Sequence, residues 1–208
     1  MSNVPLIFDN AIKIQHGSAR SIRLSDLPEQ VAAKLDPDAP QIFAPRSLPV
    51  IVREIARLSN RIVPTTEVYI APNLRRYGGF AFVERNMIVL EAPKGFCDPT
   101  FNAWGLAHTV EKLFHEVWHI CSKQLSPELY KTCADMVKDG MPLGDPSYWD
   151  TPEERLARCF QHWAMSHWMG WQSVTDDPRT HQTPSAVFAA IYSGYFAQVV
   201  AGKEGRAA

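Results

Sequence analysis

Residues Thr109–Cys121 read TVEKLFHEVWHIC and contain the motif H-E-V-W-H within a strongly apolar segment. Residues four apart lie on one face of an α-helix, so His115 and His119 can direct their imidazoles at one point. Glu116 follows the first histidine and projects about 100° further round the same helix. The spacing therefore predicts two metal ligands with a general base beside the metal.

A plainer explanation of these histidines is that they are packed residues on a half-buried helix face, which is common without any metal. Here apolar side chains at positions 106, 110, 113, 114, 117, 118 and 120 surround them. Two histidines and a glutamate are costly to bury in such a helix unless something binds them. We therefore favour the metal site.

Composition limits the classes of partner. The chain has 208 residues, of which 46% are apolar and 21% charged, with a net charge of −1, as in an ordinary globular protein. This balance gives no electrostatic reason to expect nucleic acid or an anionic membrane as partner. No apolar run approaches the ~20 residues of a membrane span, and the N-terminus lacks the pattern of a secretory signal. We expect a cytoplasmic protein.

The cysteines do not indicate a metal or redox centre. Cys97, Cys121, Cys133 and Cys159 are widely spaced, and the sequence has no C-x-x-C pair. Those among apolar residues are expected to be free, buried thiols.

The chain is expected to have two parts. Residues 1–46 contain five prolines and one short helical candidate, residues 25–35, which predicts a proline-rich arm. Ser47 then begins an amphipathic helix with Pro49 in its first turn. The compact domain is accordingly predicted to cover residues 47–208.

Within that domain, short β-prone runs precede a series of helices. The runs are residues 67–71, 80–83 and 87–90, and the three polar residues between the last two predict a hairpin. Helices are predicted at about 103–123, 126–139, 151–169 and 183–199. Strands followed by helices indicate an α+β fold. Trp118, Trp163 and Trp168 have the spacing of interior residues.

A third metal ligand must come from another segment, because catalytic zinc usually takes three protein ligands and keeps one position for water. No histidine follows the motif until His162, and His167 comes later on the same helix. Glu153 and Glu154 begin that helix and offer carboxylates. We prefer a carboxylate to either histidine.

The helix from Thr151 carries E-R-L-A-R-C-F at Glu154–Phe160. Together with H-E-V-W-H, this resembles the gluzincin arrangement, in which H-E-x-x-H is paired with E-x-x-A-x-x-F on a second helix. With Trp163 three residues further on, residues 67–171 are similar to the zincin-like metallopeptidase domains found in phage and mobile-element proteins.

The resemblance implies a zincin-like α+β fold with a small, mostly antiparallel sheet and further C-terminal helices. It implies that Zn²⁺ is bound by His115, His119 and Glu154, with Glu116 as the catalytic base. Ala157 would be the small residue that lets the two helices approach.

Two observations leave the choice between the glutamates open at this point. T-P-E-E also fits a capping box, in which Thr151 and Glu154 satisfy each other's backbone groups. A helical wheel places Glu153 nearer the middle of the apolar stripe, whereas Glu154 lies towards its edge. We give the motif more weight and choose Glu154.

These residues predict a zinc-dependent metallopeptidase that hydrolyses a protein or peptide substrate. The resemblance further implies an edge strand that aligns the substrate by main-chain pairing, for which Met87–Glu91 is the candidate. Tyr148, Tyr192 and Tyr195 are candidates to stabilise the oxyanion. The alternative is a zinc-containing binding or regulatory module of phage or mobile-element origin that acts on a host protein without cleavage. Glu116 favours the enzyme, since a structural site needs no base.

Overall fold

The computed structural model describes residues 10–36, 38, 47–75, 78–92, 103–123, 125–136, 151–170 and 192–193. The chain divides into two compact units, Met1–Leu113 and Phe114–Ala208. The division falls inside helix α3 (Ala103–Ser122), and the predicted boundary after residue 46 falls inside the first unit. Among the described residues, no helix combines the length and apolarity needed to cross a membrane.

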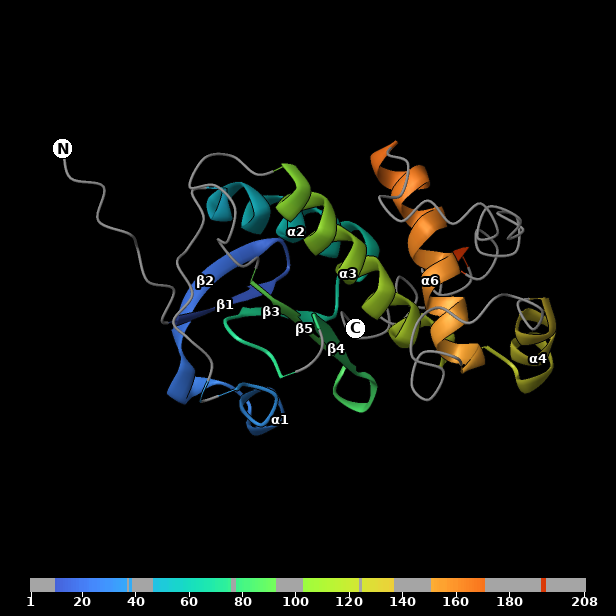
Figure 1. Ribbon diagram of the computed structural model, residues 1–208, viewed down its shortest axis with the longest axis horizontal. Coiled ribbons are helices and arrows are strands. Elements are labelled where there is room, and N and C mark those ends of the chain that lie inside the picture. The colour runs from blue at the N-terminus through green and yellow to red at the C-terminus, as the bar shows by residue number, and fades with distance from the viewer. Residues whose placement is uncertain are drawn as a thin grey trace, which may run out of the picture. The chain divides into compact units, whose positions relative to one another are not determined.

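The first unit contains a five-stranded mixed sheet with strand order β2-β1-β3-β5-β4. The strands are β1 (Asn10–Gln15), β2 (Ser18–Arg23), β3 (Glu67–Ala71), β4 (Gly79–Phe82) and β5 (Met87–Glu91). Three neighbouring pairs are antiparallel, and β3 with β5 is parallel. The predicted α+β class is confirmed, with a small mixed sheet (Figure 1).

The N-terminal strands correct the prediction of an extended arm. β1 pairs with β3 as well as with β2, so residues 10–23 belong to the sheet. His16 and Gly17 make the tight turn between them with φ of 50° and 75°. The prediction missed this hairpin because β2 is an almost wholly exposed edge strand without an apolar pattern. The hairpin joins the sheet through the pairing of β1 with β3, about fifty residues later in the chain.

The single helix expected at residues 25–35 is also corrected. A 3₁₀ turn at Leu24–Asp26 is followed by the short helix α1 (Glu29–Ala32), and Pro28 lies between them. Proline has no N–H and disfavours a helical conformation in the residue before it, so one continuous helix is interrupted here.

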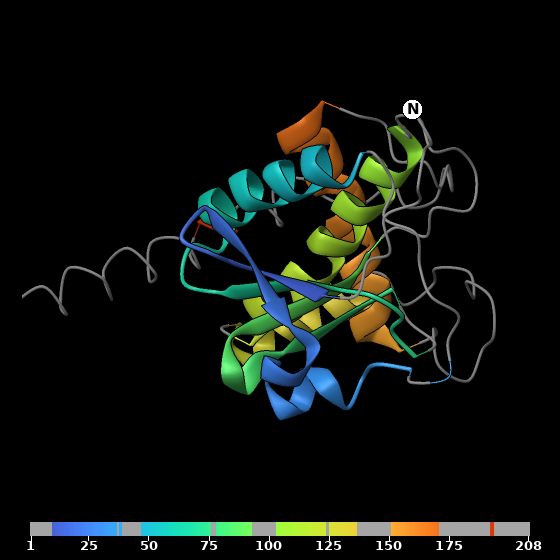
Figure 2. The ribbon, with the colours of Figure 1, turned by 90° about the vertical axis from the view of Figure 1, so that its left-hand side faces the viewer.

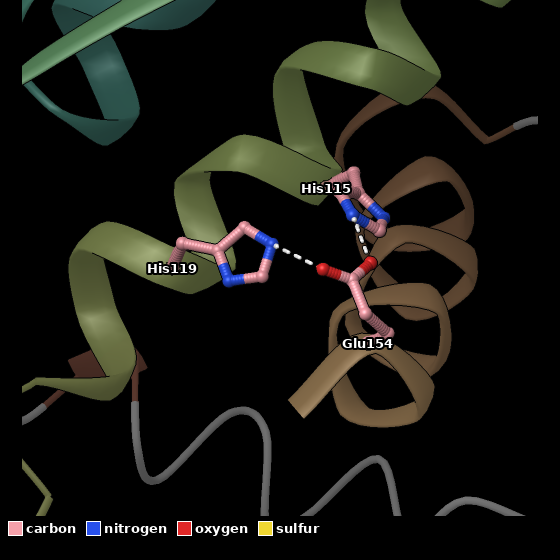
Figure 3. A group of neighbouring side chains, drawn as sticks. All are labelled: His115, His119 and Glu154. Atoms are coloured by element: carbon pink, nitrogen blue, oxygen red, sulfur yellow. Dashed lines mark hydrogen bonds and ion pairs between the residues drawn. The ribbon is translucent and has the colours of Figure 1, made fainter. Parts of the chain in front are cut away.

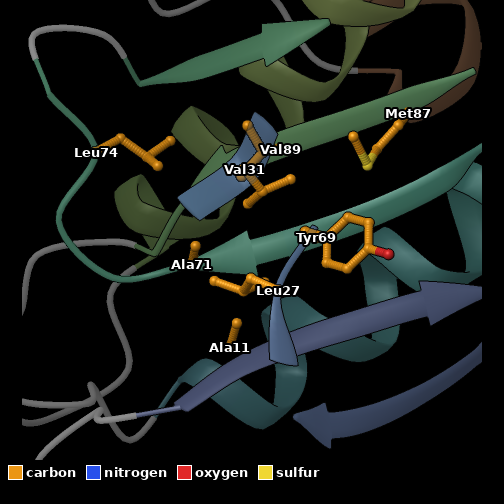
Figure 4. Packing of buried hydrophobic residues seen from close by; sticks show 8 residues of the cluster. All are labelled: Ala11, Leu27, Val31, Tyr69, Ala71, Leu74, Met87 and Val89. Carbon is orange, nitrogen blue, oxygen red and sulfur yellow. The ribbon is translucent and has the colours of Figure 1, made fainter. Parts of the chain in front are cut away.

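The sheet buries apolar side chains on both faces. Helix α2 (Leu48–Ile62) lies on one face and α1 on the opposite face, as two perpendicular views show (Figures 1 and 2). On the α1 side a buried cluster forms from strands, α1 and neighbouring loops (Figure 4). Its members are Ala11, Leu27, Val31, Tyr69, Ala71, Leu74, Met87 and Val89. Because side chains alternate along a strand, Val68, Ile70, Ile88 and Leu90 face the other side, and all four are fully buried.

The hairpin of β4 and β5 was predicted, and the structure confirms it. A 3₁₀ turn (Val83–Arg85) leads into Asn86, which adopts the left-handed conformation with φ 49°. The Asn86 amide donates to the Thr65 carbonyl oxygen at 3.0 Å and accepts from Thr66 Oγ1 at 2.7 Å. Asn86 thereby fixes the start of β5 beside the start of β3.

The position of β5 in the sheet corrects one functional expectation. Met87–Glu91 was predicted to be an edge strand that could pair with a peptide, but β5 lies between β3 and β4. Its backbone is paired on both sides. The edges of the sheet are β2 and β4.

The second unit is helical where the structure describes it. It comprises the second half of α3, α4 (Pro127–Met136) and α6 (Pro152–Ala164), which continues as a π-helical turn, Met165–Met169. The predicted helices at 103–123, 126–139 and 151–169 are thus confirmed within a few residues. The last predicted helix lies outside the described residues except for Tyr192–Ser193, which are helical.

Aromatic side chains form the interior of this unit. Trp118 is fully buried and contacts Phe160, with ring centroids 5.6 Å apart. Trp168 on the π-helical turn lies 5.4 Å from Phe114 and 5.1 Å from Trp163 between ring centroids. Trp118 is therefore interior as predicted, whereas Trp163 and Trp168 are half-buried at the border of the cluster.

Cys121 and Cys159 are buried free thiols, as expected, and burial raises the pKa of the Cys121 thiol. Cys97 and the side chain of Cys133 lie outside the described residues.

Asn86→Ala should lower the free energy of unfolding by about 1–3 kcal/mol. The substitution removes side-chain hydrogen bonds worth about 1 kcal/mol each and places a Cβ without a local hydrogen bond in the left-handed region. Urea unfolding of the variant measures the loss. Arg85→Ala, at the exposed neighbouring position, should stay within about 0.5 kcal/mol of the parent, and equal losses in both variants would contradict the role given to Asn86.

Candidate metal centre

Helix α3 presents the H-E-V-W-H motif with its apolar side inward. Val117 and Trp118 are fully buried, and Ile120 is nearly so. His115 and His119 lie on a less buried stripe, with side chains 14% and 17% exposed. Their rings approach edge to face with centroids 5.1 Å apart. The helix thus holds two imidazoles one turn apart, as the spacing predicts.

The start of α6 supplies the carboxylates. Thr151 caps the helix, because its Oγ1 accepts from the Glu154 backbone N–H at 3.3 Å, and Pro152 occupies the first turn. The helix buries Leu156, Ala157 and Phe160. Phe160 contacts Trp118, so the two motif helices of the second unit pack directly against each other.

Glu154 lies between the two histidines (Figure 3). Its Oε2 lies 3.1 Å from His115 Nε2, and its Oε1 lies 3.7 Å from His119 Nε2. One potential ligand atom from each of His115, His119 and Glu154 lies within 4.8 Å of the others, so this group could hold a metal ion. The structure brings together the three residues that the sequence predicts as ligands.

Glu153 meets His119 from another side. Its Oε1 lies 3.0 Å from His119 Nδ1 and accepts from Ser122 Oγ, also at 3.0 Å. Its side chain is 32% exposed, twice the 16% of Glu154. The two consecutive glutamates therefore contact different nitrogens of the site, and only Glu154 faces the Nε2 atoms of both histidines.

Tyr130 on α4 is a member of this site that the sequence did not predict. Its hydroxyl forms a hydrogen bond with Glu153, and burial together with that carboxylate raises the pKa of Tyr130 to about 12. The phenol therefore stays protonated at neutral pH and can donate only as a neutral group. No periodic pattern in the sequence links α4 to α6, so no sequence signal indicated this contact.

The charges around His119 favour its protonated form. Burial disfavours the imidazolium, but the hydrogen bond with Glu153 and the charges of Glu116 and Glu154 outweigh burial and raise the pKa of His119. Burial also opposes ionisation of both glutamates. Hydrogen bonds to His119 and His115 respectively nevertheless lower the pKa of Glu153 and of Glu154. Both are carboxylates at neutral pH.

The predicted base, Glu116, lies on the same helix as the histidines and is 7% exposed. Its charge acts on His119, as the raised pKa of that imidazole shows. Within the described residues, Glu116, Glu153 and Glu154 therefore place three acidic groups around one histidine.

The other candidate residues, and His108 on the same helix as the motif, have different surroundings where the structure describes them. His162 is half-buried, and exposed His167 stacks on Trp163 with centroids 4.8 Å apart. Neither belongs to the group that could hold a metal among the described residues. Tyr192 contacts Trp168, with centroids 4.8 Å apart, whereas Tyr148 and Tyr195 lie outside the described residues. His108 belongs to the first unit, where burial and Lys112 lower its pKa to about 4.

Comparison with protein-family models, with curated proteins and with solved structures finds no match for this chain. What can be concluded about function therefore depends on the residues of the site.

In the metal-free protein, the pKa of His119 should lie above 6.5, and Glu153→Gln should lower it, because the variant loses the charge and the hydrogen bond that favour the imidazolium. A histidine whose pKa is higher in the folded than in the unfolded state stabilises the fold at a pH below its unfolded pKa. This contribution is lost as the pH rises through the folded pKa. Titration of the His119 ring by NMR, with chelator present, measures the shift.

Glu54→Gln, in the first unit, is the matched control for this titration because Glu54 pairs with Arg57 rather than with the site. It should leave the His119 titration unchanged. A His119 pKa below 6.5 in the parent would contradict the arrangement of charges described above.

His115→Ala and Glu154→Ala should each weaken metal binding by more than about 100-fold, because each removes one of the three groups that could bind the ion directly. Loss of an outer partner of a ligand costs less, about 10- to 100-fold. Zinc dissociation constants from competition with a chromophoric chelator give the comparison. His167→Ala is the control and should bind zinc like the parent. Equal affinity in Glu154→Ala and the parent would remove Glu154 from the ligand set.

Proposed function

We propose that this chain is a zinc-dependent metallopeptidase that hydrolyses peptide bonds in a protein substrate. The observation that supports this most is that one donor atom from each of His115, His119 and Glu154 lies within 4.8 Å of the others. The histidines come from α3 and the glutamate from α6. Glu116 directly follows the first of these histidines.

The residues present fit a divalent ion in both chemistry and charge. Two imidazole nitrogens and one carboxylate oxygen are a known set of protein ligands for catalytic zinc. Three carboxylates act on His119, so the site holds an excess of negative charge that a divalent cation would balance. Bound there, zinc would acidify a water molecule towards neutral pH and polarise a substrate carbonyl.

The chain's own chemistry centres on Glu116. Its carboxylate would accept the proton of the water that attacks the peptide carbonyl carbon, and would then return it to the nitrogen as the C–N bond breaks. One product is a carboxylic acid and the other an amine. His115, His119 and Glu154 would remain as ligands throughout.

Glu116 favours hydrolysis over the other reactions that metal ions bound by two histidines and a carboxylate catalyse. Two histidines with one carboxylate also bind ferrous iron in oxygenases. The position of an acidic residue next to the first ligand on the helix is typical of zinc hydrolases, where that residue acts as general base. We therefore propose hydrolysis.

Glu116→Gln tests the proposal. The variant should bind zinc as the parent does but lose at least about 100-fold in the turnover number for peptide cleavage, because general-base catalysis contributes about 10²–10⁴-fold. Purified protein is loaded with one equivalent of zinc, and cleavage of an unstructured protein such as casein is followed by mass spectrometry.

Glu84→Gln is the matched control, since Glu84 is an exposed glutamate in the first unit, and it should cleave like the parent. If the parent and Glu116→Gln both bind zinc and neither of them cleaves the substrate, the result would contradict the peptidase and support a binding module. Equal cleavage by parent and Glu116→Gln would remove Glu116 from the mechanism.

A further inference from the structure

Glu153 is held by three groups from two helices. It accepts from Ser122 Oγ at 3.0 Å, contacts His119 Nδ1 at 3.0 Å, and forms a hydrogen bond with Tyr130. Ser122 and His119 lie in the last turns of α3, while Tyr130 lies on α4. The start of α6 is already capped by Thr151. Capping of this helix therefore does not explain the contacts of Glu153.

These contacts determine which nitrogen of His119 carries a proton. An ionised carboxylate can only accept hydrogen bonds, so the nitrogen facing Glu153 must be the donor. Nδ1 therefore carries hydrogen, and in neutral His119 the lone pair lies on Nε2. Nε2 is also the atom that faces Glu154. The tautomer that Glu153 selects is the one a metal ligand requires.

His115 meets the carboxylates differently from His119. Its Nε2 meets Glu154 directly at 3.1 Å, so the proton of that bond lies where a metal ion would bind. His119 is thus already arranged for ligation, whereas His115 must give up its contact with Glu154.

We propose that Glu153 and Tyr130 are positioning residues for the ligand His119. Tyr130 donates to Glu153 and, with Ser122, holds its carboxylate against His119 Nδ1, so that His119 Nε2 points at the metal. Helix α4 is in this way part of the metal centre, although none of its described side chains belongs to the group that could hold the ion. The proposal rests on the metal site of the proposed function, but its structural part concerns His119 alone and can be tested without metal.

The structure offers a matched pair of tyrosines for the experiment. Tyr69 in the first unit also donates to a glutamate, Glu67 Oε2, at 2.8 Å. Tyr130→Phe and Tyr69→Phe therefore remove the same kind of hydrogen bond, one at the proposed centre and one in the sheet. Any general effect of losing such a bond appears in both variants.

The first measurement is the tautomer of His119 in the metal-free protein, read from long-range ¹H–¹⁵N NMR spectra at a pH at which the ring is neutral. The parent and Tyr69→Phe should show hydrogen on Nδ1. Glu153→Ala should raise the population with hydrogen on Nε2, and Tyr130→Phe should raise it to a smaller extent. A parent with hydrogen mainly on Nε2, or no change in Tyr130→Phe, would overturn the proposal whether or not the protein binds zinc.

The second measurement is the cobalt(II) dissociation constant, with the visible absorption of the bound ion as the signature of its geometry. Glu153→Ala should weaken cobalt binding by about 10- to 100-fold, as is typical for outer partners of a ligand, and Tyr130→Phe by a smaller factor. The double variant should bind no more weakly than Glu153→Ala, because Tyr130 acts through Glu153. If the losses of cobalt affinity in the two single variants add up in the double variant, Tyr130 does not act through Glu153.

A parent that binds no cobalt or zinc would refute the proposed function, while the tautomer measurement still decides whether Glu153 and Tyr130 position His119. Tyr69→Phe should match the parent in affinity and absorption. A spectrum in Tyr69→Phe altered as much as in Tyr130→Phe would identify a general effect of folding and overturn the positioning role.

Discussion

A carboxylate between two imidazoles, in a setting that is largely shielded from water, is the interaction on which the second unit depends. Glu154 contacts His115 and faces His119, and Glu153 contacts the other side of His119. Charges so placed are costly without a partner, and removal of one member leaves the other buried and uncompensated. The packing of Trp118 against Phe160 keeps the two helices close enough for these contacts, so the polar site and the apolar interface support each other.

The two helices bring the groups together by different local means. On α3 the four-residue spacing alone places the histidines on one face. On α6 the cap of Thr151 and the fixed φ of Pro152 define where the helix begins, and this determines the directions of the next two side chains. Carboxylates in a first turn are also favoured by the helix dipole. The same residues therefore begin the helix and form the site.

Local patterns in the sequence predicted what depends on one helix, and missed what depends on pairing between distant segments. The H-E-V-W-H spacing and the Glu154 motif identified three residues that do converge. Amphipathicity favoured Glu153 and the motif favoured Glu154, and each pointed to a residue of the site, because the two carboxylates meet different nitrogens of the histidines. The β1–β2 hairpin and the contact of Tyr130 with Glu153 were missed, since each is fixed by a partner far along the chain. Gly17 was a local signal of the turn between the two strands, because glycine readily adopts the positive φ found there.

The π-helical turn at Met165–Met169 has a consequence for how such chains can diverge. A π turn is an α-helix widened by one extra residue, and here it sets the direction of Trp168, which meets Phe114, Phe160 and Trp163. Loss of a single amino acid from this stretch would restore regular α-helical winding and change the directions in which the side chains within the turn, Trp168 among them, leave the helix. Such a deletion would therefore move the Trp168 indole away from the aromatic rings that it contacts, although the rest of the helix could keep its path.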